Sequence, residues 1–325
     1  MGPLLCIMGP TASGKTDLAV ALAEALGGEL ISVDSALVYR GLDIGSAKPE
    51  YPHHLIDVCD PEEVYSAARF AADARALIDD LRARGRRPIL VGGTMLYFRA
   101  LLQGLAPMPA ADAALREELN ARADREGWPA LHRQLERLDP AAAQRIHPNH
   151  SQRLLRALEV CLLAGRPLSE LHAQTQESVE DALCFALAPA DRAVLHRRIE
   201  RRLEVMMSAG FVDEVRRLRQ RPGLHPALPS MRSVGYRQLW EHLDGACDLD
   251  TAKARALAAT RQLAKRQLTW LRKWPGLLWL RTDESGAAQL QPPAARERGV
   301  GDSSLAGFRG EPAKVVLNYL EQQAM

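Results

Sequence analysis

The residues with the clearest chemistry lie near the N-terminus, where positions 9–16 fit the phosphate-binding pattern Gly-x4-Gly-Lys-Ser/Thr. The glycines let consecutive backbone N–H groups approach an anion, Lys15 adds a positive charge, and the hydroxyl of Thr16 can ligate Mg²⁺. The pattern predicts a phosphate-ester site and leaves the ligand open among a nucleoside triphosphate, a nucleotide to be phosphorylated and a diphosphate leaving group. This phosphate loop consists of Gly9, Pro10, Thr11, Ala12, Ser13, Gly14, Lys15 and Thr16.

Local sequence around the phosphate loop predicts the elements that position it. Residues 4–8 form an apolar run typical of a buried strand, and residues 17–26 have helical spacing. A second strand over residues 29–33 ends at Asp34, which should lie with the loop at the carboxyl edge of a parallel sheet. We expect Asp34 to be a catalytic or metal-linked carboxylate, the alternative being a turn or helix-cap residue.

Two further segments point to the same edge. A strand over residues 89–91 ends in Gly92-Gly93-Thr94 and lacks the acid that usually follows such a strand in ATPases, which disfavours ATP hydrolysis. In a helix expected over residues 191–208, Arg202 flanks the apolar face and should reach the site, the alternative being a salt bridge at the edge of that face. The apolar face consists of Leu195, Ile199, Leu203 and Met206.

Composition limits the class of protein. With 325 residues, of which 47% are hydrophobic, the chain can bury a large core together with an insertion. No apolar run approaches the roughly 20 residues of a membrane span, so we expect a cytoplasmic protein. We also expect a monomer. The five cysteines are widely spaced without a Cys-x-x-Cys pattern, which predicts free thiols rather than disulfides or a metal site.

The order of strand and helix signals predicts an α/β fold, in which a P-loop NTPase-like parallel sheet core carries a helical insertion domain. Short strands are also expected over residues 54–58 and, at the edge of the sheet, over residues 277–280. The expected parts are the first part of the core (1–106), the helical insertion (107–182), the second part of the core with basic helices (183–282), and a poorly ordered tail with a short closing helix from Pro312 (283–325).

The strongest indication of a partner is a helix expected over residues 251–274, which contains seven cations and no acid. Solvated helices usually mix charges for i,i+4 pairing, so this one favours a polyanion, most simply nucleic acid. Residues 232–237 add cations and Tyr236, an aromatic that can stack on a base. Arg153 and Arg156 share a helix face in the insertion, with an ordinary solvated face as the alternative.

These residues together resemble the bacterial tRNA dimethylallyltransferase (tRNA isopentenyltransferase) family over nearly the whole chain to about residue 281. The chain is shorter than the family pattern between Pro49 and Pro52 and over residues 176–183. The resemblance rests on Gly-Pro-Thr-Ala-Ser-Gly-Lys-Thr at 9–16, Ile-Ser-Val-Asp-Ser-Ala at 31–36, Asp-Ile-Gly-Ser-Ala-Lys-Pro at 43–49, Val-Gly-Gly-Thr-Met-Leu-Tyr-Phe at 91–98, Ser-Val-Gly-Tyr-Arg-Gln at 233–238 and Thr-Arg-Gln-Leu-Ala-Lys-Arg-Gln at 260–267.

The resemblance implies transfer of a dimethylallyl group from dimethylallyl diphosphate to the N6 amine of the adenine 3′-adjacent to the anticodon, in tRNAs that read codons beginning with U. It implies that Asp34 is the base, that Lys15, Arg202 and Thr16 act on the diphosphate, and that Thr16 also holds Mg²⁺. The family's contacts with the tRNA anticodon stem-loop map onto Asp34, Ser35, Ala36, Leu37, Thr94, Arg116, Gln152, Arg153, Leu154, Leu155, Arg156, Arg232, Ser233, Val234, Gly235, Tyr236, Arg237, Lys265, Arg266, Gln267, Leu268, Thr269, Trp270, Leu271 and Arg272.

Two other functions would use part of the same chemistry. A small-molecule or nucleotide kinase would need the phosphate loop and an acid at the sheet edge, but it leaves the basic helix unexplained. A non-enzymatic RNA-binding protein that retains the loop as a nucleotide switch is the third interpretation.

Overall fold

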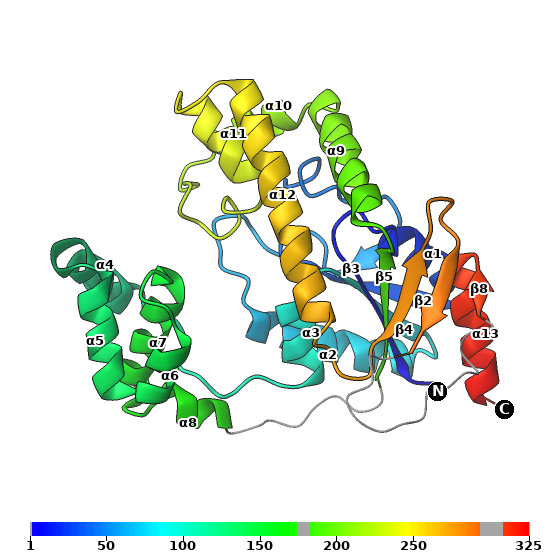
Figure 1. Cartoon of the computed structure of the whole chain (residues 1–325), viewed down its shortest axis with the longest axis horizontal. Coiled ribbons are helices and arrows are strands. Elements are labelled where there is room, and N and C mark those ends of the chain that lie inside the picture. Colours follow the sequence, from blue (N-terminus) through cyan, green and yellow to red (C-terminus); the bar gives the residue numbers. More distant parts are fainter. Residues whose placement is uncertain (1, 174–181, 293–307, 325) are drawn as a thin grey trace. The chain divides into compact units, whose positions relative to one another are not determined.

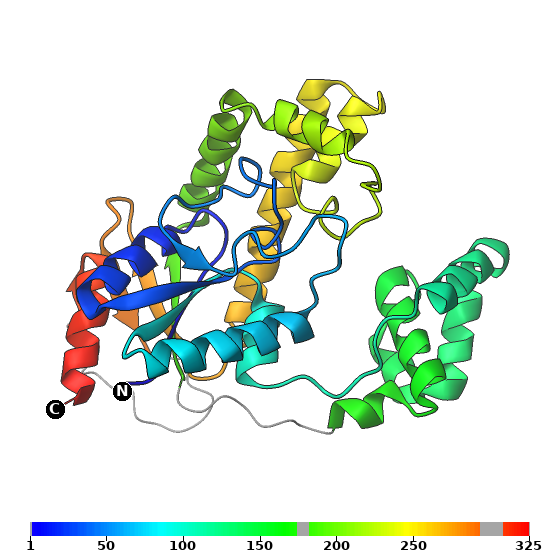
Figure 2. The same ribbon diagram turned by 180° about the vertical axis from the view of Figure 1, so that it is seen from behind.

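The computed structural model describes residues 2–173, 182–292 and 308–324. The chain divides into two compact units, which we call the core unit (Met1–Leu101 with Glu180–Met325) and the helical unit (Leu102–Val179). Figures 1 and 2 show the ribbon from opposite sides. Each unit is described by itself.

The core unit alternates strands and helices and then continues in a run of helices. Its first half contains β1 (Leu4–Met8), α1 (Lys15–Leu26), β2 (Gly28–Val33), β3 (His53–His54), α2 (Ala67–Ala83), β4 (Arg87–Gly92) and α3 (Met95–Leu102), whose last residue is the first of the helical unit. Its second half contains β5 (Ala182–Pro189), α9 (Arg192–Ser208), α10 (Phe211–Arg219), α11 (Tyr236–Leu243), α12 (Leu249–Leu271), β6 (Leu278–Thr282), β7 (Ala288–Gln291), β8 (Arg309–Gly310) and α13 (Pro312–Ala324).

These strands form one eight-stranded sheet with the order β3-β2-β4-β1-β5-β6-β7-β8. Neighbours from β3 to β6 pair in parallel, and β7 and β8 pair antiparallel. The predicted α/β fold with a mostly parallel sheet is confirmed. The strand expected over residues 277–280 is present as β6, but its expected place at the edge of the sheet is wrong, because β6 lies between β5 and β7. The expected strand over 54–58 is also wrong, because Leu55 and Asp57 have φ of 62° and 57°, which ends β3.

Chain connections decide which helices cover each face of the sheet. The β1–α1–β2 crossover and the β3–α2–β4 crossover run in opposite directions along the sheet. Because such crossovers are right-handed, α1 and α2 lie on opposite faces. The connections from β4 to β5 and from β5 to β6 run in the direction of α2, so α3 and the long α12 lie on the α2 face (Figure 1). The connections that follow β1 and its neighbour β4 therefore run in opposite directions along the sheet. Such a reversal leaves a crevice at the carboxyl ends of the strands, where ligands bind.

The face of the sheet beneath α1 and α13 shows why this sequence folds. Alternate residues of β1 and β5 point to that face, and Leu5, Ile7 and Phe185 are fully buried against Leu18 and Leu22 of α1. Such burial stabilises a fold by roughly 1.5–3 kcal/mol for each large apolar side chain. The amphipathic spacing of α1 is therefore what fixes the phosphate loop between strand and helix.

The C-terminal segment is more ordered than expected where the structure describes it. β7 pairs with β6 and β8, and Ala288 and Leu290 are buried, so the expected poor order is wrong for residues 283–292 and 308–311. The helix expected from Pro312 is present as α13. Residues 293–307 of the expected tail, and residues 176–181 of one of the two short segments, lie outside the described residues.

The helical unit has its own hydrophobic core. Leu119, Leu131, Leu135 and Leu158 are among its most buried residues. Its helices are α4 (Ala113–Glu126), α5 (Trp128–Leu138), α6 (Pro140–Arg145), α7 (Ser151–Ala164) and α8 (Leu168–Ala173).

All five cysteines are free thiols, as expected. Within the described ranges, no helix is both long and apolar enough to cross a membrane.

Candidate active site

Residues 9–16 form a phosphate loop between the end of β1 and the start of α1. A Cβ at Gly9 would lie 2.6 Å from the carbonyl oxygen of Leu187 and 2.7 Å from Oγ of Ser13, so only glycine fits. Gly14 caps α1 with a φ of 89°, which again favours glycine. The loop therefore presents backbone N–H groups and a helix N-terminus, the two features that bind phosphate.

Two cations meet at this loop. Lys15 Nζ donates to the carbonyl of Pro10 at 3.4 Å, and Arg202 donates to Oγ1 of Thr11 at 3.4 Å and to the carbonyl of Ser46 at 3.2 Å. Burial and the charge of Arg202 lower the pKa of Lys15 to about 8, although the charge of Asp34 opposes them. Burial also lowers the pKa of Arg202. Neither cation forms an ion pair with a carboxylate in the described part of the chain, so a bound anion would supply the missing negative charge. The salt bridge considered for Arg202 is not observed.

Asp34 follows β2 directly, at the carboxyl edge of the sheet. Its Oδ1 accepts the N–H groups of Ala36 at 2.8 Å and Leu37 at 3.4 Å, so the turn role does occur. Its Oδ2 has no hydrogen-bond partner among the described residues, and the side chain lines two cavities. One oxygen thus shapes the turn while the other remains able to accept a proton.

Two cavities meet at Asp34, and we call them the inner and the outer cavity. The inner cavity measures about 160 Å³ and contains Lys15, Thr16 and Arg202 at its polar end. The outer cavity measures about 520 Å³ and contains aromatic and basic side chains. The residues that line both cavities are Asp34, Ala36, Ser233, Val234, Leu263 and Gln267.

Glu214 holds one wall of the inner cavity in place. Its carboxylate is 3% exposed and accepts the N–H groups of Asp43 at 3.2 Å, Ile44 at 2.6 Å and Gly45 at 3.1 Å. It also accepts the hydroxyl of Tyr236 at 2.6 Å. This buried acid therefore fixes the loop that contains Ser46, the residue whose carbonyl contacts Arg202.

Tyr236 is buried, which contradicts the prediction that its ring is available to stack on a base. Its side chain is 0% exposed, its ring packs edge-on against Phe211 at 4.9 Å between ring centroids, and its hydroxyl is bound to Glu214. Burial, followed by the negative charge of Glu214, raises the pKa of Tyr236 above its ordinary value. In the sequence Tyr236 lies near Arg232 and Arg237, but in the structure its side chain contacts Phe211 and Glu214.

Tyr236→Ala is expected to lower the free energy of unfolding by about 3–5 kcal/mol, because it opens a cavity in a packed site. Tyr236→Phe keeps the ring and leaves Glu214 short of one donor, so the loss should be smaller, about 1–3 kcal/mol. Urea unfolding of the two variants measures both effects. A Tyr236→Ala variant as stable as wild type but weaker in tRNA binding would restore the stacking role.

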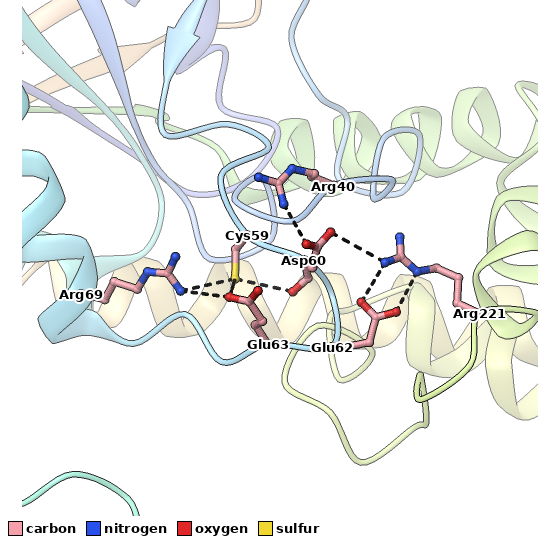
Figure 3. A network of polar contacts seen from close by, with 7 residues as sticks. All are labelled: Arg40, Cys59, Asp60, Glu62, Glu63, Arg69 and Arg221. Carbon is pink, nitrogen blue, oxygen red and sulfur yellow. Dashed lines mark hydrogen bonds and ion pairs between the residues drawn. The ribbon is translucent and has the colours of Figure 1, made fainter.

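A polar network anchors residues 220–235, the segment that leads to α11 (Figure 3). Arg221 binds both carboxylate oxygens of Glu62, at 2.8 and 2.9 Å, and approaches Asp60 at 3.7 Å. The hydroxyl of Ser230 donates to the carbonyl of Pro61. Such exposed pairs are individually weak, but a network on one short segment limits its movement. The segment therefore presents Arg232 at the outer cavity from a fixed base.

The basic helix α12 is only partly as predicted. It begins at Leu249 and includes Asp250, and three of its cations are paired with acids: Lys253 with Asp250, Arg255 with Glu241, and Arg261 with Glu200. Its C-terminal part differs, because no described acid pairs with Lys265, Arg266 or Arg272. The free positive charge is therefore concentrated at the end of α12 that borders the outer cavity.

Several predicted tRNA contacts are corrected by burial. The side chains of Leu154, Leu268 and Leu271 lie in the hydrophobic cores, so they are not available to RNA. Trp270, in contrast, is 38% exposed beside the outer cavity. Gln152 and Arg153 are exposed on the helical unit.

Arg116 and Arg156 have structural partners within the helical unit. Both bind Glu159, which is 0% exposed: Arg116 at 2.8 and 2.9 Å, and Arg156 at 2.6 Å. Burial alone would raise the pKa of Glu159, but these hydrogen bonds outweigh it and keep the pKa below its usual value. A contact of either arginine with tRNA remains a prediction.

The two glycines at the end of β4, Gly92 and Gly93, serve packing within the protein. A Cβ at Gly92 would lie 2.0 Å from the carbonyl oxygen of Val33, and one at Gly93 would lie 2.4 Å from Nε2 of Gln267. The hydroxyl of Thr94 accepts the N–H of Ser35 at 3.0 Å. These glycines therefore allow the close approach of β2 and α12.

Comparison with known proteins identifies the family. A family model described as IPP transferase matches residues 37–274, and one described as Isopentenyl transferase matches residues 3–56. The chain belongs to the IPP transferase family. A tRNA dimethylallyltransferase of Chromohalobacter salexigens is 59% identical over 87% of this chain and 93% of its own length, and one of Bordetella petrii is 56% identical over 84% and 90%. The kinase and RNA-switch interpretations are therefore set aside.

Solved structures agree with the family assignment. A tRNA isopentenylpyrophosphate transferase from Bacillus halodurans matches with a TM-score of 0.63 and 39% identity, over 87% of this chain and 91% of that one. A eukaryotic dimethylallyltransferase acting on tRNA matches with a TM-score of 0.72 and 26% identity, over 86% and 74% of the two chains.

Sequence reasoning missed the role of Glu214 in this IPP transferase and assigned Gln267 to tRNA alone. A signal for Glu214 was present, because it lies on the apolar face of α10 together with Phe211 and Leu218, where an acid needs buried partners. No local signal distinguishes Gln267 from the other polar residues of α12.

Proposed function

We propose that this protein transfers the dimethylallyl group of dimethylallyl diphosphate to the N6 amine of the adenine 3′-adjacent to the anticodon, giving N6-isopentenyladenosine and diphosphate. The substrates are tRNAs that read codons beginning with U. One observation carries the proposal: Asp34 lies where the cavity with the phosphate-loop cations meets the cavity with aromatic and basic side chains. The relatives named tRNA dimethylallyltransferase support the same reaction.

The polar end of the inner cavity suits the diphosphate. Breaking the allylic C–O bond leaves an electron pair and negative charge on the diphosphate. Lys15, Arg202 and the N–H groups of the phosphate loop are already in place for that charge, so they stabilise it as it develops. Fixed donors in a half-buried site act more strongly than water does, because they need no reorganisation.

The apolar end of the inner cavity suits the dimethylallyl chain. Leu203, Met206, Val234 and Leu263 line this end. Apolar walls bind a five-carbon chain and exclude water, which would otherwise capture the allylic carbon. The dimethylallyl group thus lies between the phosphate loop and Asp34.

Asp34 supplies the base. The N6 amine is a weak nucleophile that must lose a proton as its bond to carbon forms. We propose that Oδ2 of Asp34, which has no partner among the described residues, accepts that proton. The adenine then enters from the outer cavity, because a base of the anticodon loop must leave its stack to reach the carboxylate.

Magnesium fits the donor set at the loop. The structure describes no group of three or more His, Cys, Asp or Glu that could hold a metal alone. The Thr16 hydroxyl lines the inner cavity, so we propose that it binds Mg²⁺ together with diphosphate oxygens. The ion would neutralise charge on the leaving group.

The direct test is mass spectrometry of tRNA after incubation with the protein, Mg²⁺ and dimethylallyl diphosphate. The proposal expects a single adenosine beside the anticodon to gain one dimethylallyl group. No mass increase in tRNA that reads U-initial codons would overturn it. We also propose that the protein acts as a monomer in the cytoplasm, which sedimentation with and without tRNA can test.

The C-terminal part of α12, whose cations have no acid partner among the described residues, should increase tRNA affinity by contacting phosphates. Replacing Lys265 and Arg266 together with Ala is expected to weaken tRNA binding and to make the slope of log affinity against log salt shallower by roughly 0.7–0.9 for each lost contact. The matched control is Lys253→Ala with Arg255→Ala on the same helix, where both cations are already paired with acids. Equal salt slopes for the two double variants would contradict the placement of tRNA at the end of α12.

A further inference from the structure

One side-chain amide joins α12 to the phosphate loop. Oε1 of Gln267 accepts the backbone N–H of Thr11 at 2.9 Å, and Nε2 donates to the carbonyl of Gly93 at 2.9 Å. The two bonds fix the orientation of the amide, because the reverse placement would set an NH₂ group against the Thr11 N–H. Gln267 is 8% exposed, and Gly93 has no room for a side chain beside it. The amide thus connects the carboxyl ends of β1 and β4.

Thr11 carries this connection into the donor site. Its backbone N–H is held by Gln267, and its hydroxyl accepts a hydrogen bond from Arg202 at 3.4 Å. Both bonds hold one residue of the phosphate loop, two positions after Gly9. Loss of the Gln267 bond would free Thr11 to turn, and Arg202 would lose one of its two positioning contacts.

We propose that Gln267 is a positioning residue for the diphosphate, holding Thr11 so that the phosphate loop and Arg202 stay aligned on the leaving group. This role rests on the proposed function only in the identity of the donor. It differs from the tRNA contact that the family resemblance assigns to position 267. Exposed neighbours of Gln267, among them Lys265, Arg266 and Trp270, stay the predicted tRNA contacts of α12.

Three variants test the role. Gln267→Leu has similar volume and removes both hydrogen bonds. Gln267→Glu keeps the acceptor for Thr11 but, when ionised, turns a second oxygen toward the carbonyl of Gly93. Gln262→Ala is the control, because Gln262 is an exposed glutamine on the same helix and lines neither cavity.

Binding of inorganic diphosphate with Mg²⁺, measured by calorimetry, is the primary readout because it does not require transfer. Gln267→Leu should weaken diphosphate binding roughly tenfold, while tRNA affinity stays within about twofold of wild type. Gln267→Glu should approach wild type as the pH falls, because a protonated carboxyl can again donate to Gly93, whereas Gln267→Leu should show no such recovery. A purely structural role would not produce this pH-dependent rescue.

The outcomes separate this role from the proposed function. Diphosphate affinity equal to wild type in a folded Gln267→Leu variant overturns the positioning role, as does a loss of tRNA affinity with diphosphate binding intact. If Gln267→Leu does not fold, the pH series of Gln267→Glu decides instead. A ratio of its diphosphate affinity to that of wild type that stays constant with pH overturns the role. Absence of prenyl transfer by the wild-type protein would overturn the proposed function and leave the diphosphate result standing.

Discussion

Replacement of Asp34 with Asn is expected to lower single-turnover prenyl transfer by roughly 10²-fold or more at saturating substrates. The amide retains an oxygen that can accept the N–H groups of Ala36 and Leu37, so the turn should persist. It cannot accept the proton of the attacking amine. The expected result is therefore a folded protein that binds diphosphate and tRNA and reacts slowly, measured by rapid quench with labelled donor.

A second substitution at the same position separates chemistry from turn geometry. Asp34→Ala removes both the base and the acceptor that holds the turn. A further loss of transfer rate relative to Asp34→Asn therefore measures what the turn contributes. Rates for Asp34→Asn within about threefold of wild type would rule out Asp34 as the proton acceptor.

Lys15→Ala is expected to reduce kcat/KM for the donor by roughly 10²-fold or more, because a preorganised charge facing the leaving group is lost. Arg202→Ala should act in the same direction, and tRNA affinity should remain nearly unchanged in both variants. Arg201→Ala is the matched control, since Arg201 is exposed on the other side of α9. If Arg202→Ala instead loses tRNA binding and keeps its affinity for the donor, Arg202 contacts the tRNA and not the diphosphate.

The pH dependence of donor binding gives an independent test of Lys15. Its pKa is lowered to about 8, chiefly by burial, and a bound diphosphate would raise it again. Binding then takes up a proton at pH above about 8, so donor affinity should fall as the pH rises, by up to tenfold per unit. Lys15→Ala should lack this component. A pH-independent wild-type affinity between pH 8 and 9.5 would contradict the assignment.

The layout of the candidate active site could be predicted from sequence because its motifs are local. The phosphate loop needs a fixed order of glycine, lysine and hydroxyl residues within eight positions, and the strand before it and the helix after it are visible as apolar patterns. Asp34 could be placed because every parallel strand of this sheet delivers its next residue to the same edge. The resemblance to the family rests on these same short segments.

The partners of individual side chains could not be predicted in this way. Tyr236 and Trp270 both lie among cations in the sequence, yet one is enclosed by Phe211 and Glu214 and the other is exposed beside the outer cavity. Arg261 belongs to a run of cations, but its charge is paired with Glu200 on α9, which is 61 residues away. Burial and pairing depend on which distant segments meet, and no local pattern contains that information.

By itself, the sequence determined the parallel α/β core, the phosphate loop and the acid at the sheet edge, because each follows from the order of neighbouring residues. Only the tertiary structure decided that Glu214 holds the wall of the inner cavity and that Gln267 binds Thr11 across 256 positions of sequence. The reason is that a buried polar group must find its hydrogen-bond partners in space, wherever in the chain they lie.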